Sequence, residues 1–401
     1  MMSIGKNEKV ILGLTAMLYA MLYLYTAIPF GTVITFALAA ILFFISVSEN
    51  QKKEILGVEF FHGYLLAFVA FCFLSALWAW DRQRAISMGM SMLKTGIITV
   101  LLFEYYRHKS DVNGLIDALL WGGYLACGVI VLLYDPVKLI MILITGYRID
   151  NTYLNANSTG LLASITVIVH MHLIMQEKKL QRRDWLLLFG VFLIAISGSK
   201  KALLFFVGGC FLLVAIRCIE VKMPWKKILL IMSGIMVVMI GILMLPVFDH
   251  LRFRLESMIT GLLGTGSESA STSLRIRYMR IGMEQFTKTP LLGIGMDSSW
   301  ELVEKIVGVP AYLHCNFVEL LACGGIVGFV IYYSVYGYVF YNLYKYRKYT
   351  DQNLALMLTL LILLFMMDLA MVSYYSKETY FYLIFLYMYV RNMKLKAGMV
   401  E

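Results

Sequence analysis

His314 stands where a long polar segment ends and an apolar run begins. The chain there reads AYLHCNFVELLACGGIVGF. Histidine is the side chain best suited to take a proton near neutral pH, so it can activate a hydroxyl group as a general base. What His314 can do therefore depends on which face of the molecule this boundary lies on and which charges lie near it.

Two groups of cationic residues could accompany this histidine. Arg275, Arg277 and Arg280 lie in STSLRIRYMRIGMEQF, and Lys200 and Lys201 lie in SGSKKALL. A guanidinium group binds phosphate through two parallel hydrogen bonds, whereas an ammonium group binds it as a point charge. These residue types suit an anionic headgroup or a phosphate.

The composition places most of the chain in lipid. Of 401 residues, 60% are hydrophobic and only 15% are charged, which is too few to cover a soluble surface. An apolar run of about 20 residues spans the roughly 30 Å hydrocarbon core, and its backbone must bond internally, as in an α-helix. The sequence therefore predicts an all-α, polytopic membrane protein.

Apolar runs recur along the chain and predict about twelve transmembrane helices in a single membrane domain, residues 1–401. The first run is long for a signal-peptide core and no small-residue cleavage site follows it, so we expect a retained helix. Residues 136–147 are apolar but brief, which favours a re-entrant or interfacial segment. The predicted spans are 10–27, 29–48, 60–80, 86–105, 115–134, 159–176, 184–198, 201–219, 226–247, 314–343, 353–373 and 377–392.

Basic residues select the orientation. If the N-terminus is cytoplasmic, every short segment on that side carries lysine or arginine, as the positive-inside rule requires. Arg107, Lys179, Lys227, Arg347 and Arg391 are examples. We therefore predict that both termini are cytoplasmic. The net charge of +10 is explained by this topology, and nucleic-acid binding is not expected.

The positive charges on the other side need a different explanation. In this orientation the longest loop, about 248–313 between the ninth and tenth spans, is extracytoplasmic, and His314 lies at its end. The loop contains a predicted amphipathic helix over 271–286, followed by a compact turn in KTPLLGIGMDS. One face of that helix carries Leu274, Tyr278, Ile281 and Gln285, and another carries Arg277, Arg280 and Glu284.

Each feature also has a non-catalytic explanation. The helix could lie in the membrane interface with its arginines facing lipid phosphates. Lys200 and Lys201 could extend from a helix end to the interface, although two adjacent lysines in so tight a turn also suit a phosphate pocket. His314 could be an interfacial histidine with a satisfied ring nitrogen.

The six cysteines are scattered, mostly in apolar runs, without a paired CxxC spacing. We predict buried apolar side chains, with neither a disulfide framework nor a metal site. No DxD-like carboxylate pair stands out in the outer loops. We therefore expect the chemistry to need no metal and no other cofactor.

Three stretches, in this order, resemble the O-antigen ligase and polymerase family of bacterial integral membrane glycosyltransferases: SGSKKALL, STSLRIRYMRIGMEQFTKTPLLGIG and HCNFVELLACGGIVGF. Members have a Ser-Arg-rich turn between mid-chain spans and an arginine-bearing helix in the large outer loop that runs into P-L-x-G-x-G. They then have H-N-x-aromatic before G-x-x-G. LSALWAWD and NANSTGLL are weaker matches of the same kind. The resemblance covers about residues 60–345.

Two positions depart from the family pattern. Lys200 stands where an arginine is usual, which keeps the charge but loses the bidentate fork; Lys201 can share its role. Cys315 follows the histidine where asparagine is usual, and Asn316 lies one place further on. The resemblance places Asn316 with the substrate-binding residues and leaves its role there open.

The resemblance implies transfer of a glycan from undecaprenyl pyrophosphate to an acceptor hydroxyl at the outer face of the bacterial cytoplasmic membrane. Clustered cations would stabilise the charge that grows on the departing pyrophosphate. The implied partners are the lipid-linked oligosaccharide, membrane lipid, a chain-length regulator and a flippase. The implied site assigns Arg275, with Arg277 or Arg280, and Lys200 and Lys201 to the pyrophosphate and His314 to the acceptor, with His314 and Arg275 as the catalytic pair.

Three functions remain open at this point. A polymerase would build capsular, exo- or O-antigen polysaccharide, and we favour it as the commoner role. A ligase would transfer the finished glycan to lipid A core or another carrier. A transporter of the same lipid-linked sugars would place its charges at the bilayer midplane. Lys94 and Asp368 are the main mid-span charges here, whereas the cationic cluster lies at one face, which favours an enzyme.

Overall fold

The computed structural model describes residues 6–49, 57–134, 136–145, 155–177, 180–244 and 270–399, together with residues 249, 252–253 and 256. The regular structure in these residues is helical, without a strand, which confirms the predicted all-α class. Seven helices among them are long and apolar enough to cross a membrane. The protein is therefore a multi-pass membrane protein. The count of twelve spans stays a prediction, because helices such as α8 (Leu186–Ser197) are too short for this criterion.

The helices follow the predicted apolar runs closely. The runs at 159–176 and 201–219 become α7 (Ala156–Glu177) and α9 (Lys200–Glu220). The brief run at 136–147 becomes the ten-residue helix α6 (Pro136–Thr145). All six cysteines are buried and free, as the sequence predicts.

The chain divides into two compact units. Two helices, α2 (Gly31–Glu49) and α15 (Leu354–Ala370), contribute residues to both. Unit 1 consists of Met1–Leu38, Val112–Glu268 and Asp351–Leu363, and unit 2 consists of Ala39–Asp111, Ser269–Thr350 and Leu364–Glu401.

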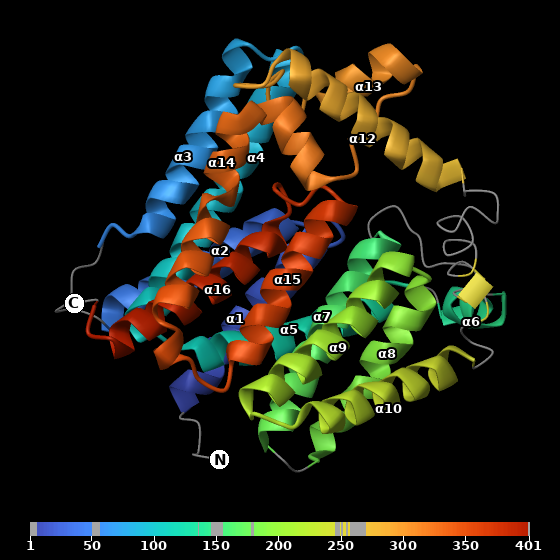
Figure 1. The fold of residues 1–401 in the computed structure, drawn as a ribbon. Helices are drawn as coiled ribbons and strands as arrows, with labels where there is room; N and C mark the ends of the chain where they lie inside the picture. Colours follow the sequence, from blue (N-terminus) through green and yellow to red (C-terminus); the bar gives the residue numbers. More distant parts are fainter. Residues whose placement is uncertain are drawn as a thin grey trace. The chain divides into compact units, whose positions relative to one another are not determined.

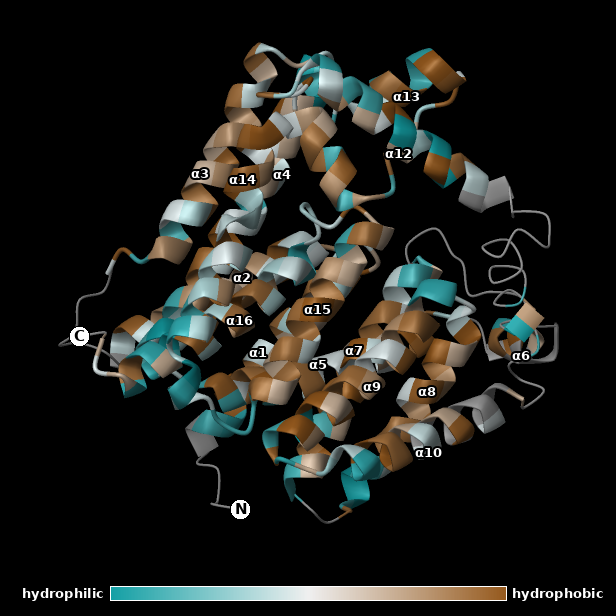
Figure 2. Ribbon diagram, viewed as in Figure 1, coloured by the Kyte–Doolittle hydropathy of each residue, from teal (hydrophilic) through white to brown (hydrophobic). Residues whose placement is uncertain are grey.

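Unit 1 is built around α7, which packs against α5, α8 and α9 (Figure 1). A Cβ on Gly123 would lie 2.1 Å from Thr166 Oγ1, so glycine is needed for α5 and α7 to approach. Figure 2 shows that α8 and α9 are hydrophobic along most of their length. The remaining helices of this unit are α1 (Lys6–Leu24), α5 (Val112–Leu133), η2 (Arg182–Trp185) and α10 (Trp225–Leu243).

Unit 2 contains a bundle of long helices, with α12 and α13 at one end (top in Figure 1). Its core is aromatic: Phe61, Phe68, Phe103, Tyr332 and Tyr374 are all buried. Its helices are α3 (Phe60–Leu74), η1 (Ser75–Leu77), α4 (Arg82–Lys109), α12 (Ala270–Lys288), α13 (Ser299–Val307), α14 (Asn316–Lys345), η4 (Arg347–Tyr349) and α16 (Lys377–Lys396).

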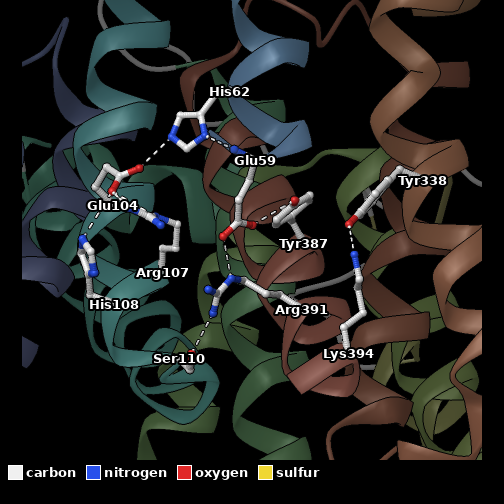
Figure 3. Close-up of polar contacts among 10 residues, drawn as sticks. All are labelled: Glu59, His62, Glu104, Arg107, His108, Ser110, Tyr338, Tyr387, Arg391 and Lys394. Atoms are coloured by element: carbon white, nitrogen blue, oxygen red, sulfur yellow. Dashed lines mark hydrogen bonds and ion pairs between the residues drawn. The ribbon is translucent and has the colours of Figure 1, made fainter. Parts of the chain in front are cut away.

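A polar network joins the start of α3 to the ends of α4 and α16 (Figure 3). His62 Nε2 lies 2.7 Å from Glu104 Oε1, and Arg107 pairs with the same carboxylate at 2.7 Å. Arg391 Nε donates to Glu59 Oε1 at 2.9 Å. These residues come from segments that the sequence assigns to the cytoplasmic side. In Figure 1 the start of α3 and the end of α16 lie at the opposite end of unit 2 from α12 and α13. The orientation of the chain in the membrane stays a prediction.

Candidate active site at a broken helix

Helix α14 is broken at Gly325, where the backbone adopts φ 61° and ψ −165°. Such a break frees backbone groups that must find partners within the protein. The turn after α12, residues 289–298, supplies them. The four bonds are Ile294 N to Ala322 O (3.1 Å), Gly295 N to Cys323 O (2.9 Å), Ile326 N to Pro290 O (2.8 Å) and Val327 N to Leu291 O (3.1 Å).

The glycines of both segments permit this backbone pairing. A Cβ on Gly293 would lie 2.4 Å from Cys323 O, and a Cβ on Gly325 would lie 2.3 Å from Leu291 O. Both glycines also have positive φ, which other residues adopt only with strain. The P-L-x-G-x-G and G-x-x-G motifs of the sequence are therefore two halves of one interlocked structure.

The weaker match LSALWAWD completes the same structure. Trp78 Nε1 donates to Leu292 O at 3.1 Å, and Trp80 N donates to Ile294 O at 2.9 Å. Ser75 Oγ accepts from Met296 N at 3.1 Å. Three stretches that are far apart in the sequence thus form one scaffold immediately beside the start of α14.

His314 lies on this scaffold, two residues before α14, with its backbone in the left-handed region at φ 60°. Its half-buried ring contacts two tyrosines: the Tyr312 centroid is 4.0 Å away, and the Tyr278 ring of α12 is nearly parallel at 5.9 Å. A non-glycine residue held at positive φ is a feature that recurs at functional sites. The structure thus presents one defined imidazole at the junction of α12 and α14.

Two buried residues of α14, Glu319 and Asn316, fix the position of the segment that carries His314. Glu319 accepts from Leu313 N at 2.9 Å and from the hydroxyl of Ser299. Asn316 is fully buried, and its Oδ1 accepts from the backbone N–H groups of Ser373 and Tyr374, each at 3.0 Å. The polar atoms of Asn316 are therefore engaged inside the protein.

The mid-span carboxylate Asp368 extends this buried network. Tyr333 OH donates to Asp368 Oδ2 at 2.9 Å, and the Ser373 hydroxyl donates to Oδ1. Tyr333 OH also accepts from Asn316 Nδ2 at 3.1 Å. Buried polar groups must be paired in this way, and a fully paired network fixes one arrangement of the segments that carry it.

The three arginines of α12 differ in their surroundings. Arg275 is half-buried, one helical turn before Tyr278, and lies close enough to Tyr312 for its charge to counter the burial that raises the Tyr312 pKa. Arg277 and Arg280 are exposed. The structure therefore brings Arg275 close to Tyr312, which contacts His314.

Lys200 and Lys201 belong to unit 1, at the start of α9. Ser199 caps this helix by accepting from Ala202 N at 3.2 Å, and its hydroxyl donates to Asn157 Oδ1 at 2.8 Å. Asn157 lies in the first turn of α7, so two helix N-termini meet beside the lysines. Helix N-termini attract anions, and so do the positive charges of the two lysines.

Asp297 is a site residue that the sequence did not single out. Burial raises its pKa to about 6, although the nearby Arg84 guanidinium, 3.6 Å from Oδ2, and the Trp300 side chain oppose that rise. The sequence could have indicated Asp297, because it is a carboxylate directly after the glycine turn, in GIGMD. Glu319 was missed as well, although it is a charge within an apolar run.

Together, these helices and side chains define a multi-pass membrane protein with a histidine and an arginine held at one end of a helical bundle. Residues 185–333 match a family model described as O-antigen ligase, and this segment contains His314, Arg275, Lys200 and Lys201. The match confirms the resemblance to the O-antigen ligase and polymerase family, whose activity is that of a glycosyltransferase-type enzyme. No curated protein matches the chain.

Proposed function

We propose that the protein joins undecaprenyl-pyrophosphate-linked oligosaccharides into a surface polysaccharide at the outer face of the cytoplasmic membrane. The observation that carries the proposal is the placement of His314. Its left-handed backbone, its contacts with two tyrosine rings and the presence of Arg275 on the adjoining helix support a fixed general base beside a phosphate-binding group.

In the proposed reaction, the acceptor hydroxyl oxygen attacks the anomeric carbon of the donor. The bond from that carbon to the pyrophosphate oxygen breaks, and its electron pair leaves with the pyrophosphate. The imidazole of His314 takes the hydroxyl proton. Arg275 stabilises the negative charge on the leaving group more in the transition state than in the ground state.

The other predicted residues take supporting parts in this proposal. Lys200 and Lys201 would bind phosphate, which their place at a helix N-terminus supports. Arg277 and Arg280 are exposed and available to donor or lipid phosphate. Asn316, which the sequence placed with the substrate-binding residues, is in this proposal a positioning residue for the His314 segment, because it bonds to the backbone of Ser373 and Tyr374.

The test replaces His314 with asparagine. Asparagine tolerates φ near 60° and keeps a hydrogen-bonding group, so the fold should persist while the base is lost. Transfer between purified lipid-linked oligosaccharides, read as a ladder on a gel, should fall by about 10²–10⁴-fold. The matched control is His62→Gln. His62 lies in the network of Figure 3, so this change should lower thermal stability but leave turnover per folded molecule intact.

Wild-type ladders from His314→Asn would remove the base assignment. A chelator added to the wild-type enzyme tests the expected independence from metals, and loss of activity with chelator would contradict it.

A ligase is the second candidate, because the matching family model is described as O-antigen ligase. Cells lacking the gene separate the possibilities by the size of their lipid-linked glycan. Accumulation of single repeat units at the outer face supports a polymerase, long unattached chains support a ligase, and material trapped inside supports a transporter.

A further inference from the structure

A row of aromatic rings leads away from His314. The Tyr312 centroid lies 4.0 Å from that of His314, and the Trp300 ring of α13 lies 5.8 Å beyond Tyr312. Both Trp300 and Tyr312 are half-buried, so each ring is held by the protein and keeps part of its surface accessible. Accessible ring surface therefore extends from His314 through Tyr312 to Trp300.

Charged groups border the far end of this row. The Arg84 guanidinium carbon lies 5.0 Å from the Trp300 centroid, and Arg84 Nη1 lies 3.6 Å from Asp297 Oδ2. Asp81 Oδ2 lies 3.4 Å from Arg84 Nε. The Arg84 side chain is 42% exposed. A guanidinium has five N–H donors and a carboxylate has about four acceptor positions, so these groups can bind a ligand while they contact each other.

This combination suits one class of ligand. A sugar ring presents C–H groups on its faces and hydroxyl groups around its edge. Aromatic rings contact the faces, and carboxylates and guanidinium groups bind neighbouring hydroxyls. A phosphate would gain no favourable contact from the aromatic rings. A lipid tail would desolvate the charged groups at the border without pairing them.

We propose that Trp300, Tyr312, Arg84 and Asp297 form a subsite for a sugar ring of the oligosaccharide that reacts beside His314. The proposal rests on the proposed function, since it places this ring next to the base of that reaction. The ring could belong to the acceptor or to the donor, and the kinetic constants of the two substrates distinguish these sources.

The test uses the full-length enzyme with Trp300→Ala and Trp300→Phe. We expect Trp300→Ala to raise KM for one of the two lipid-linked substrates by about tenfold, because one ring contact is lost, with a much smaller change in kcat. Trp300→Phe keeps a ring and should stay within about threefold of wild type. The matched control is Trp225→Ala, because Trp225 is an exposed tryptophan outside the proposed subsite that also has a cation, the Lys226 ammonium, over its ring at 5.9 Å.

A rise in KM for the acceptor places an acceptor ring on Trp300, and a rise for the donor places a donor ring there. Unchanged KM values for both substrates in Trp300→Ala, in protein that melts like wild type, would overturn the proposal. If Trp300→Ala does not fold, Trp300→Leu, which keeps an apolar side chain without a ring, takes its place.

A second measurement separates failure of the subsite from failure of the proposed function. Free oligosaccharide, released from the lipid by mild acid, is examined by saturation-transfer NMR with wild-type protein and the three variants. Signal that is lost in Trp300→Ala but kept in Trp225→Ala supports the subsite even if no transfer is found. Absence of signal from wild-type protein would contradict the subsite while leaving transfer to be judged by the gel assay.

Discussion

Replacement of Gly325 by alanine should damage the protein far more than the same replacement twelve residues later in the same helix. Gly325 has φ 61° and ψ −165°, a conformation that is essentially restricted to glycine and that costs another residue about 1–3 kcal/mol. The new Cβ would lie 2.3 Å from Leu291 O, so the 289–298 segment must also move. That movement weakens the bonds from Ile326 N and Val327 N, each worth about 0.5–1.5 kcal/mol. Together these terms suggest a loss of about 2–6 kcal/mol.

Gly337 is the matched control. It lies in the regular part of α14, faces outward, and a Cβ there would meet nothing within 4 Å. Alanine at that position should stabilise the helix by about 0.5–1 kcal/mol. The two substitutions therefore have opposite predicted signs within one helix.

The assay heats each purified variant in detergent and follows the monodisperse fraction by gel filtration. We expect Gly325→Ala to melt roughly 2–7 °C below wild type and Gly337→Ala to melt at or slightly above it. Transfer by Gly325→Ala, measured well below its melting point, should also fall, because the displaced segment supports His314. If Gly325→Ala melts within about 1 °C of Gly337→Ala, α14 is not interlocked with the turn as described.

Three further predictions use other parts of the candidate site. Arg275→Ala should lower transfer by about 10²–10³-fold and Arg275→Lys should recover part of it, whereas Lys288→Ala on the same helix should stay active; equal activity of the two alanine variants would return Arg275 to a lipid-facing role. Burial raises the pKa of Asp297 to about 6, so the folded protein binds this proton more tightly than the unfolded chain between pH 4 and 6, and stability should fall as pH rises through that window. Asp297→Asn should remove about 2 kcal/mol of this pH-dependent change in the free energy of unfolding. If wild type and variant melt with the same dependence on pH from 4 to 7.5, the raised pKa of Asp297 is contradicted. In a background without native cysteines, a cysteine at exposed Val309 should react with an impermeant thiol reagent in intact cells and one at exposed Lys348 should not; the reverse pattern would invert the predicted orientation.

The sequence predicted the helices well because the main determinant is local. In a membrane, an apolar run must satisfy its own backbone, so its length and ends determine a helix. The amphipathic helix predicted over 271–286 is α12, and three of the four residues assigned to one face, Tyr278, Ile281 and Gln285, are buried. The fourth, Leu274, is 42% exposed. Helical periodicity gives the direction of a side chain but not how far along the helix its packing partner extends.

The scaffold of the site could not be predicted from local patterns. Gly293, Gly295 and Gly325 were visible as motifs, but which backbone groups pair between the turn and α14 depends on how segments about 30 residues apart dock. The partner of Asn316 is more distant still, at Ser373 and Tyr374, and nothing near Asn316 in the sequence indicates it. These contacts depend on tertiary structure, which outweighs local preference.

The broken helix explains how the segment before α14 can hold His314 in one position. An intact α14 would use its own carbonyls at Ala322 and Cys323 and would leave the 289–298 turn with unpaired backbone groups. The break at Gly325 lets α14 and the turn pair each other's backbone groups, so the turn is held in place by the long helix. His314, Glu319 and Ser299 are then all fixed to one scaffold, and the position of the imidazole depends on the helix and not on the loop alone. This coupling is why the stability of the Gly325 interlock and the rate of transfer should fall together in the same variant, although their assays are independent.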